Sequence, residues 1–256
     1  MADYQVGAQL YTVRDFTQTA QGMRESLRKV AEIGYKAVQV SGFGAMDPGE
    51  VRDALREYGL DCVSTHTGWD RFQNDLEAVI EEHKMWACKH PAIGGLPREY
   101  YSLDGLKRFA SELPPIAERL AQEGMTFSYH NHNHELARYE GKTWLELLYD
   151  TIDARYLKAE IDIYWIQAGG GDPAVWVRRY AGRQPLLHLK DMVVTPAREQ
   201  RFAEVGEGNL NWPAIMAAAK EAGVEWYLVE QDQCYGRDPF ESLAISYRNL
   251  RAMGLK

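Results

Sequence analysis

The feature of this sequence that most constrains its fold is a unit that repeats along the chain: a helical stretch, then a glycine, then a short apolar run. The segments AEIGYKAVQV, REYGLDCVST, AQEGMTFSYH and KEAGVEWYLV all follow this order. Glycine commonly ends a helix, and a short apolar run bounded by such signals is typical of a buried strand. Alternation of helix and strand predicts a parallel sheet whose strands are joined by helices.

Eight apolar runs have the length and setting of such strands. They are Val6–Tyr11, Ala37–Ser41, Asp61–His66, His90–Gly94, Met125–Asn131, Leu157–Asp162, Leu186–Lys190 and Trp226–Gln231. The 256 residues are close to the roughly 250 of a closed barrel of eight strand and helix pairs. An open doubly wound sheet usually has a glycine-rich phosphate turn after its first strand, and GAQLYTVRD contains none. We therefore predict one α/β domain over residues 1–256, a (β/α)8 TIM barrel.

The composition of the chain disfavours several classes of binding partner. The formal net charge of −8 argues against nucleic acid, because such binding draws much of its affinity from neutralised phosphates. Three cysteines without CxxC spacing are typical of a reducing compartment. The start MADYQVGAQLYTV has no basic segment before an apolar run, and no run approaches the roughly 18 apolar residues of a membrane span. We expect a cytoplasmic protein that binds a small molecule and neither nucleic acid nor membrane.

In a TIM barrel the active site lies at the carboxyl ends of the strands. The polar or aromatic residues at or just after these ends include Gln9, His66, Trp69, His130, His132, Glu135, Asp162, Trp165, His188, Lys190 and Glu230. Asp162, His188 and Glu230 end three successive strands after strongly apolar sequence. Buried ionisable groups are costly unless they are paired or bind a metal. The pattern predicts a divalent metal, and Mn²⁺, Mg²⁺, Co²⁺ and Zn²⁺ all suit these ligands.

The fifth strand offers several candidates for a fourth ligand. In YHNHNHE the histidines His130, His132 and His134 alternate with asparagines, so they would share one side of an extended chain. Glu135 lies just beyond, where a loop could fold it back over the barrel mouth. The residues alone leave the choice open between a histidine and Glu135.

A metal beside carboxylates and a lysine suits the removal of a proton next to a carbonyl. Polyhydroxy carbonyl compounds, whose neighbouring oxygens can chelate the metal, are the expected substrates. Lys190 would polarise a substrate oxygen. We expect substrate contacts at His66, Trp69, Gln9, Trp165 and His130, with an indole stacking on the apolar face of a ring.

Five segments in order carry a resemblance to a known family: YHNHNHE, EIDIYW, HLKD, VGEGNLNW and VEQDQ. Together they resemble the xylose isomerase-like TIM-barrel superfamily of sugar isomerases and epimerases, and within it the branch that contains inosose dehydratase. The resemblance covers nearly the whole chain. It implies a metal held by Glu, Asp, His and Glu from strands five to eight. Asp162, His188 and Glu230 take three of these places by position.

The resemblance also favours Glu135 as the fourth ligand, because the related branch has an acidic or amide residue shortly after Tyr-His-x-His. The isomerases of the family carry their glutamate inside strand five, where this chain has histidine. With Glu135 as a ligand, Glu135 and Glu230 would face each other across the substrate as an acid/base pair.

The expected function is a metal-dependent sugar isomerase or epimerase acting through a metal-stabilised enediolate. The alternative is an inosose or keto-sugar dehydratase, in which His132 and Lys190 would supply acid to a departing hydroxyl. An abasic-site endonuclease is disfavoured by the acidic composition, and the density of ionisable groups disfavours a non-catalytic sugar-binding barrel. The resemblance further implies a homodimer. Arg198, Arg201 and Arg237 are candidate phosphate contacts by location.

Overall fold

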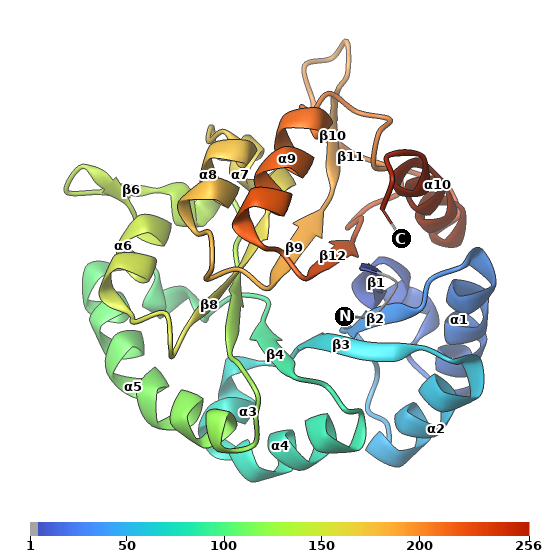
Figure 1. Ribbon diagram of the computed structural model, residues 1–256, viewed down its shortest axis with the longest axis horizontal. Helices are drawn as coiled ribbons and strands as arrows, with labels where there is room; N and C mark the ends of the chain where they lie inside the picture. Colours follow the sequence, from blue (N-terminus) through green and yellow to red (C-terminus); the bar gives the residue numbers. More distant parts are fainter. Residues whose placement is uncertain (1–4, 256) are drawn as a thin grey trace.

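A computed structural model describes residues 5–255 of the chain (Figure 1). Within that range eight parallel strands close into a barrel: β1 Val6–Gln9, β2 Ala37–Val40, β3 Asp61–His66, β4 His90–Ile93, β5 Ser128–His130, β8 Lys158–Asp162, β9 Leu186–Leu189 and β12 Trp226–Val229. Neighbours in the barrel follow one another along the chain, and β12 pairs with β1 to close it. The predicted TIM barrel is confirmed, and each barrel strand lies within the run predicted for it.

Helices cover the outside of the barrel (Figure 1). They are α1 Ala20–Ile33, α2 Pro48–Tyr58, α3 Trp69–Asn74, α4 Leu76–Met85, α5 Leu103–Gln122, α6 Trp144–Thr151, α7 Ile163–Ala168, α8 Pro173–Arg179, α9 Trp212–Ala222 and α10 Pro239–Ala252. Short 3-10 helices span Leu10–Phe16, Arg98–Tyr100 and His134–Leu136. Between residues 5 and 255, no helix has the length and apolar character needed to cross a bilayer.

Two small antiparallel hairpins lie outside the barrel. One pairs β6 Arg138–Tyr139 with β7 Lys142–Thr143, and the other pairs β10 Asp191–Val194 with β11 Gln200–Ala203. The second hairpin projects away from the barrel at the top of Figure 1.

The helix ends show why the repeated unit folds as it does. At the start of α2, the Asp47 side chain accepts hydrogen bonds from the backbone N–H groups of Gly49 and Glu50, at 2.8 and 3.2 Å. After α2 and α9, Gly59 and Gly223 adopt the left-handed conformation, with φ of 65° and 74°. A residue with a Cβ would be strained there, so these glycines end the helix and turn the chain into the next strand.

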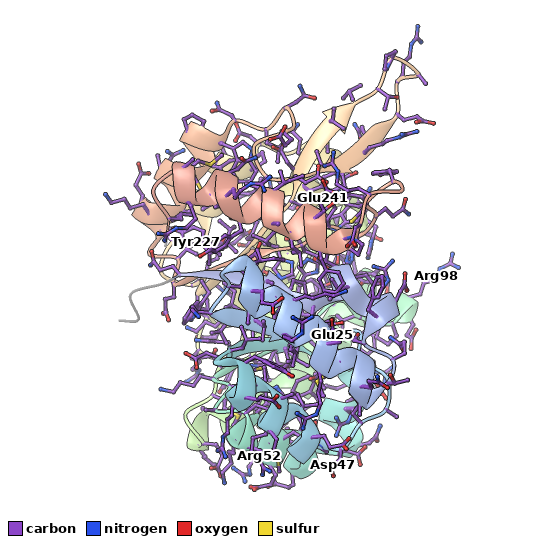
Figure 2. All side chains as sticks on the ribbon, turned by 90° about the vertical axis from the view of Figure 1, so that its right-hand side faces the viewer. Glu25, Asp47, Arg52, Arg98, Tyr227 and Glu241 are labelled. Carbon is purple, nitrogen blue, oxygen red and sulfur yellow. The ribbon has the colours of Figure 1, made fainter. Side chains whose placement is uncertain are left out.

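Helix α1 illustrates how the helices pack. Met23, Leu27 and Val30 are buried and lie on one face at helical spacing. Charged side chains cover the solvent face, as Glu25 on α1 and Glu241 on α10 show in Figure 2. The apolar faces of the helices and the outer face of the barrel together form the main hydrophobic core.

The interior of the barrel has an apolar layer and a polar layer. Ala37, Val63, Leu186 and Leu228 form a small apolar cluster with Trp226 packed against it. Side chains two residues apart on a strand point the same way, so His188 stands above Leu186 and Glu230 above Leu228, toward the carboxyl end. The carboxyl half of the barrel is therefore filled by ionisable groups rather than by the branched apolar residues usual in this fold.

Candidate metal centre

Four side chains from neighbouring strands meet at the carboxyl end of the barrel. They are His130 at the end of β5, Asp162 at the end of β8, His188 on β9 and Glu230 just after β12. All four are buried, and one ligand-type atom from each lies within 4.8 Å of the others. The structure thus brings together the three residues expected from the strand ends.

Short distances join these four groups. His130 Nε2 lies 3.1 Å from Asp162 Oδ2. His188 Nδ1 lies 3.0 Å from Glu230 Oε2 and 3.7 Å from Asp162 Oδ2. Two nitrogen and two oxygen donors therefore face one another in a space sheltered from water.

The structure supplies His130, rather than Glu135, as the residue from strand five. The Tyr129 hydroxyl donates a hydrogen bond to Glu135 Oε1 at 2.7 Å, and the His132 backbone N–H donates one to Oε2 at 2.9 Å. Both carboxylate oxygens of Glu135 are therefore engaged outside the group of four. The structure thus leaves Glu135, the first choice of fourth ligand, outside the group of four.

The expected alternation of histidines also fails beyond His130. Strand β5 ends at that residue, and a 3-10 turn follows at His134–Leu136. The turn buries Glu135 and leaves His134 half-exposed, so the histidines do not share one side of a strand. A second group that could hold an ion, His132, His134 and Glu135, forms around this turn.

Lys190 inserts its ammonium group among the carboxylates. Its Nζ lies 3.1 Å from Asp162 Oδ2, 2.8 Å from Glu230 Oε2 and 2.7 Å from Asp232 Oδ2. Burial would lower the pKa of Lys190, but these three carboxylates raise it above its ordinary value. Lys190 is therefore a fixed positive charge at neutral pH. Asp232 was not anticipated, although it follows Glu230 by two residues.

The electrostatics of the group favour a bound cation. Burial would raise the pKa values of Asp162 and Glu230, but Lys190 and His188 help to hold both below their usual range, so both remain ionised. Burial would lower the pKa of His188, but Glu160 and Glu230 raise it to about 10. A ring that holds a proton this firmly faces a strongly negative environment. The donor set of His130, Asp162, His188 and Glu230 therefore fits a divalent metal in chemistry and in charge.

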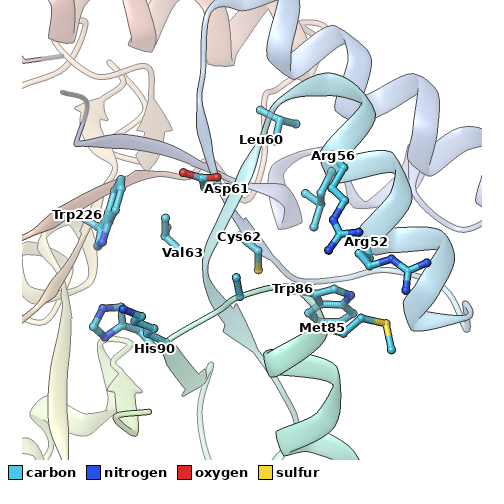
Figure 3. A pocket seen from close by; sticks show the side chains of 13 residues that line it. Arg52, Arg56, Leu60, Asp61, Cys62, Val63, Met85, Trp86, His90 and Trp226 are labelled. Atoms are coloured by element: carbon cyan, nitrogen blue, oxygen red, sulfur yellow. The ribbon is translucent and has the colours of Figure 1, made fainter. Parts of the chain in front are cut away.

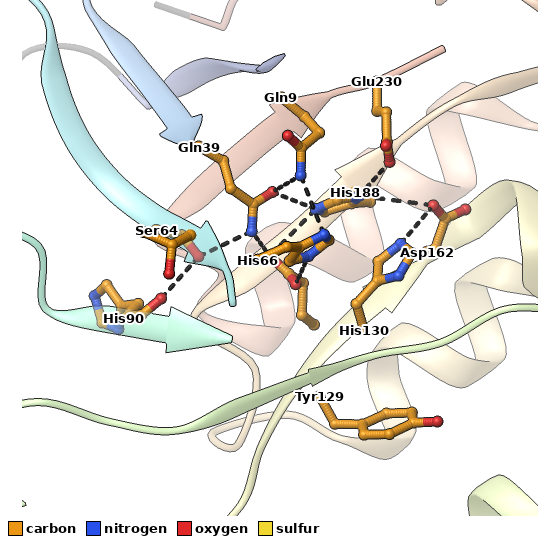
Figure 4. A network of polar contacts seen from close by, with 12 residues as sticks. Gln9, Gln39, Ser64, His66, His90, Tyr129, His130, Asp162, His188 and Glu230 are labelled. Atoms are coloured by element: carbon orange, nitrogen blue, oxygen red, sulfur yellow. Dashed lines mark hydrogen bonds and ion pairs between the residues drawn. The ribbon is translucent and has the colours of Figure 1, made fainter. Parts of the chain in front are cut away.

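A second polar layer lies directly beneath this group and was not anticipated. Glu160 is fully buried and contacts His66 Nε2 at 2.7 Å and His188 Nε2 at 3.2 Å. Gln39 Nε2 donates a hydrogen bond to Glu160 at 2.7 Å. Figure 4 shows the ring of His188 between the amides of Gln9 and Gln39 on one side and the carboxylates of Asp162 and Glu230 on the other. The signal was present in EID, because Glu160 and Asp162 share one face of β8.

Two expected substrate contacts are engaged within this layer. Gln9 is fully buried, and its amide bonds to Gln39, His66 and the Tyr11 backbone N–H. Both ring nitrogens of His66 are occupied, Nδ1 by Gln9 and Nε2 by Glu160. The structure leaves neither side chain a free polar atom for a substrate, so both belong to the support of the site.

Trp69 lies outside the barrel rather than over its mouth. It starts α3 and packs against Phe72, Phe109 and Phe127, with its Nε1–H donating to the Tyr100 hydroxyl at 3.3 Å. Because the chain turns outward immediately after β3, the indole joins the core between barrel and helices. The expectation that Trp69 stacks on a substrate ring does not agree with this position.

Trp165 and His132 do lie beside the group of four. Their ring centroids are 5.3 Å apart, and Lys190 Nζ lies 5.5 Å from the Trp165 ring. His132 Nδ1 and Trp165 Nε1 are both buried and have no hydrogen-bond partner within residues 5–255. Burial, aided by His130 and Lys190, lowers the pKa of His132 to about 2, so its ring is neutral at physiological pH. His132 could therefore donate or accept a hydrogen bond there, but it would not be a charged acid.

The HLKD and VGEGNLNW segments have a joint structural role. The Asp191 carboxylate accepts hydrogen bonds from the backbone N–H groups of Gly206, Gly208 and Leu210, at 2.9, 3.0 and 3.2 Å. It also accepts one from Trp212 Nε1 at 2.6 Å. Asp191 therefore anchors the loop that leads into α9, next to Lys190.

Two of the three candidate phosphate contacts are paired with acids. Arg201 Nη2 lies 2.6 Å from Glu199, and Arg237 Nη1 lies 2.6 Å from Glu204. Arg198 lies in the turn between β10 and β11, at the tip of the projecting hairpin. Arg201 and Arg237 line one cavity of about 430 Å³ together with Phe202 and Gln231.

A separate cavity of about 460 Å³ opens at the amino end of the barrel (Figure 3). Its lining includes the exposed cations Arg56 and Lys89, with Cys62, Trp86 and Trp226 forming an apolar part of the wall. The start of β3, the start of β4 and the start of β12 border it. Active sites of this fold lie at the opposite end, so size alone does not identify the functional cavity.

Comparisons with known proteins agree with this architecture. A family model of the xylose isomerase-like TIM barrel matches residues 27–251. An inosose dehydratase of Geobacillus kaustophilus is 28% identical, over 81% of this chain and 79% of that protein. A sugar phosphate isomerase/epimerase from Parabacteroides distasonis superposes with a TM-score of 0.84 at 24% identity, covering 98% of this chain and 95% of the other. A D-allulose 3-epimerase from Methylomonas sp. gives a TM-score of 0.72 at 15% identity, covering 97% of each chain.

The two solved structures share the fold with this chain. The family model spans most of the sequence, from within α1 to within α10. The protein belongs to the xylose isomerase-like TIM barrel family.

Proposed function

We propose that this protein is a divalent-metal-dependent enzyme that removes a proton next to the carbonyl group of a sugar or sugar derivative, with isomerisation or epimerisation as the outcome. The observation that carries the proposal is the convergence of His130, Asp162, His188 and Glu230 from four strands onto one buried space. Such a mixed set suits Mn²⁺, Mg²⁺, Co²⁺ or Zn²⁺. The family membership and the placement at the carboxyl end support it.

When bound, the metal would polarise the substrate carbonyl and neutralise the negative charge that develops on its oxygen. Asp162, His188, Glu230 and His130 would hold it. Glu230 is also the candidate base: its carboxylate is buried, contacts His188 and Lys190 through Oε2, and is held ionised by them, so it can accept a proton. Lys190, kept protonated, would donate a hydrogen bond to a substrate oxygen.

A hydroxyl-rich substrate fits the mouth of the site. The partnerless Nδ1 of His132 and Nε1 of Trp165 are buried, and a buried polar atom without a partner is costly. Hydroxyl groups of a substrate would satisfy both atoms, and the Trp165 ring offers an apolar face. The similarity to an inosose dehydratase, a sugar phosphate isomerase/epimerase and a D-allulose 3-epimerase supports a carbohydrate or cyclitol substrate.

Dehydration is the second candidate. It begins with the same proton removal and then expels a hydroxyl group, which must receive a proton. Lys190 is a protonated group within the site, and the inosose dehydratase relative supports this outcome. Because Glu135 lies outside the group of four, the two-base route to epimerisation has less support than proton removal by one base.

Solvent exchange separates these outcomes. The protein loaded with Mn²⁺ is incubated in D₂O with a panel of ketoses and inososes. Deuterium at the carbon next to the carbonyl, without loss of water, is the result expected for an isomerase or epimerase. A conjugated enone absorbance would identify the dehydratase. Absence of exchange with every compound, or exchange that persists with EDTA, would contradict the proposal.

A further inference from the structure

Glu160 contacts two histidines inside the barrel, His66 and His188. It lies on β8, two residues before Asp162, and it is fully buried. Its Oε1 lies 3.2 Å from His188 Nε2, and its Oε2 lies 2.7 Å from His66 Nε2. The two imidazole rings stack with centroids 5.3 Å apart and an angle of 15° between their planes. One carboxylate therefore spans two parallel rings.

The contacts of His188 assign its two nitrogens different roles. Nε2 faces two acceptors, Gln39 Oε1 at 2.7 Å and Glu160 Oε1 at 3.2 Å. The orientation of the Gln39 amide is fixed, because its Nε2 donates to Glu160 and to Ser64 Oγ. Nε2 of His188 must therefore carry a proton. Nδ1 is the nitrogen that faces Asp162 and Glu230.

The contacts of His66 follow the same logic. Its Nδ1 lies 3.3 Å from Gln9 Nε2, which is a donor. The orientation of the Gln9 amide is fixed, because its Oε1 accepts a hydrogen bond from the Tyr11 backbone N–H at 3.0 Å. His66 Nδ1 therefore accepts, and its Nε2–H donates to Glu160. Glu160 is thus the common acceptor for both rings.

We propose that Glu160 is a positioning residue for the metal centre: it keeps a proton of His188 on Nε2, so that Nδ1 is the nitrogen left to bind the metal beside Asp162 and Glu230. Through His66 it also braces the ring stacked on His188. The inference rests on the proposed function in one respect, that a divalent metal binds at Asp162, His188 and Glu230. Partners that orient a metal-bound histidine in this way typically change metal affinity 10- to 100-fold when they are altered.

Titration with Co²⁺ tests the proposal, because Co²⁺ reports both affinity and coordination geometry through its visible absorption. Glu160→Gln replaces one acceptor oxygen by a donor, so one of the two rings loses its acceptor. We expect the Co²⁺ dissociation constant to rise about 10- to 100-fold, with a changed absorption spectrum. Glu160→Asp keeps the charge but is one methylene shorter, so it cannot span both rings. We expect it to weaken Co²⁺ binding by a smaller factor.

Glu204→Gln is the matched control. Glu204 is also a buried carboxylate, but it bonds to Ser242 Oγ at 2.7 Å and pairs with Arg237, away from both rings. We expect its Co²⁺ affinity and spectrum to match those of the unaltered protein. A role for Glu160 through charge alone predicts that Glu160→Asp binds as tightly as the unaltered protein, and that result would overturn the proposal.

The outcomes separate this inference from the proposed function. If the unaltered protein binds Co²⁺ and both Glu160 variants match it in affinity and spectrum, the positioning role is wrong and the proposed function stands. If the unaltered protein binds no Co²⁺, both are wrong. If Glu160→Gln does not fold, Glu160→Asp alone decides between the two results.

Discussion

The two ends of this barrel both carry charged side chains, but they organise them differently. At the carboxyl end, Asp162, His188, Lys190 and Glu230 are buried and contact one another at 2.8 to 3.7 Å. At the amino end, the cations border a cavity of about 460 Å³ and are exposed, as Arg56 illustrates. Buried ionisable groups that shift one another's pKa values mark a functional site more reliably than an open cavity does. The comparison predicts that catalysis depends on the residues at the carboxyl end of the barrel and not on those at the amino end.

The largest expected effect is on turnover. Glu230→Gln removes the candidate base while keeping the size of the side chain, so we expect kcat to fall about 10²- to 10⁴-fold. Arg56→Gln at the amino end is the matched control, and its kcat should be unchanged. Steady-state kinetics with the substrate identified by deuterium exchange measures both. Equal losses in the two variants would break the contrast between the ends.

A second expected effect is on stability. Lys190→Met removes the cation that contacts three carboxylates, so we expect the free energy of unfolding to fall by about 3–5 kcal/mol in EDTA. Mn²⁺ should restore part of the loss, because it replaces the missing positive charge. Lys89→Met at the amino end should change stability by no more than about 0.5 kcal/mol. Urea denaturation with EDTA and with Mn²⁺ measures these changes. An unchanged free energy of unfolding for Lys190→Met would contradict the role of Lys190 in neutralising the three carboxylates.

A third effect concerns the pH dependence of stability. Burial raises the pKa of Glu135 from 4.5 to about 7, so the folded state binds this proton more tightly than the unfolded state. The stabilisation is full below pH 4.5 and is lost as pH rises through about 7. Relative to Glu135→Gln, the unaltered protein should lose about 3 kcal/mol between pH 4.5 and 8. Denaturant titrations of both proteins across this range measure it, and parallel pH profiles would contradict the assignment.

The smallest effect distinguishes two tryptophans. Trp165→Phe removes an indole N–H that has no partner among residues 5–255, so we expect KM to rise about 2- to 10-fold with little loss of stability. Trp69→Phe removes a packed indole and its bond to Tyr100, so we expect lower stability and an unchanged KM. A rise in KM for Trp69→Phe alone would reverse the assignment of the two side chains.

The barrel and part of the centre were predictable from the sequence for a simple physical reason. Most residues of a barrel strand are apolar, so the end of the strand is visible where an ionisable residue follows an apolar run. Asp162, His188 and Glu230 were found in this way. The carboxyl ends of adjacent strands lie side by side in a TIM barrel, so the side chains that follow them are expected to converge.

The remaining features depend on contacts between residues distant in sequence. Glu160 lies inside a strand, and only the packing of β3 and β9 around β8 shows that it spans two histidines. Trp69 and Trp165 both follow a strand, yet one turns outward into the core and the other stays at the mouth. In YHNHNHE the alternation predicted an extended chain, but Glu135 is instead fixed by Tyr129 and by the backbone of His132. These choices are made by tertiary contacts.

The most direct test of the central claim is anomalous diffraction from crystals of the protein loaded with Mn²⁺. The account predicts one strong peak per chain, in contact with Asp162, His188 and Glu230, with His130 as the ligand from β5. A peak bound by Glu135 with His132 and His134, or no peak at the carboxyl end of the barrel, would contradict it.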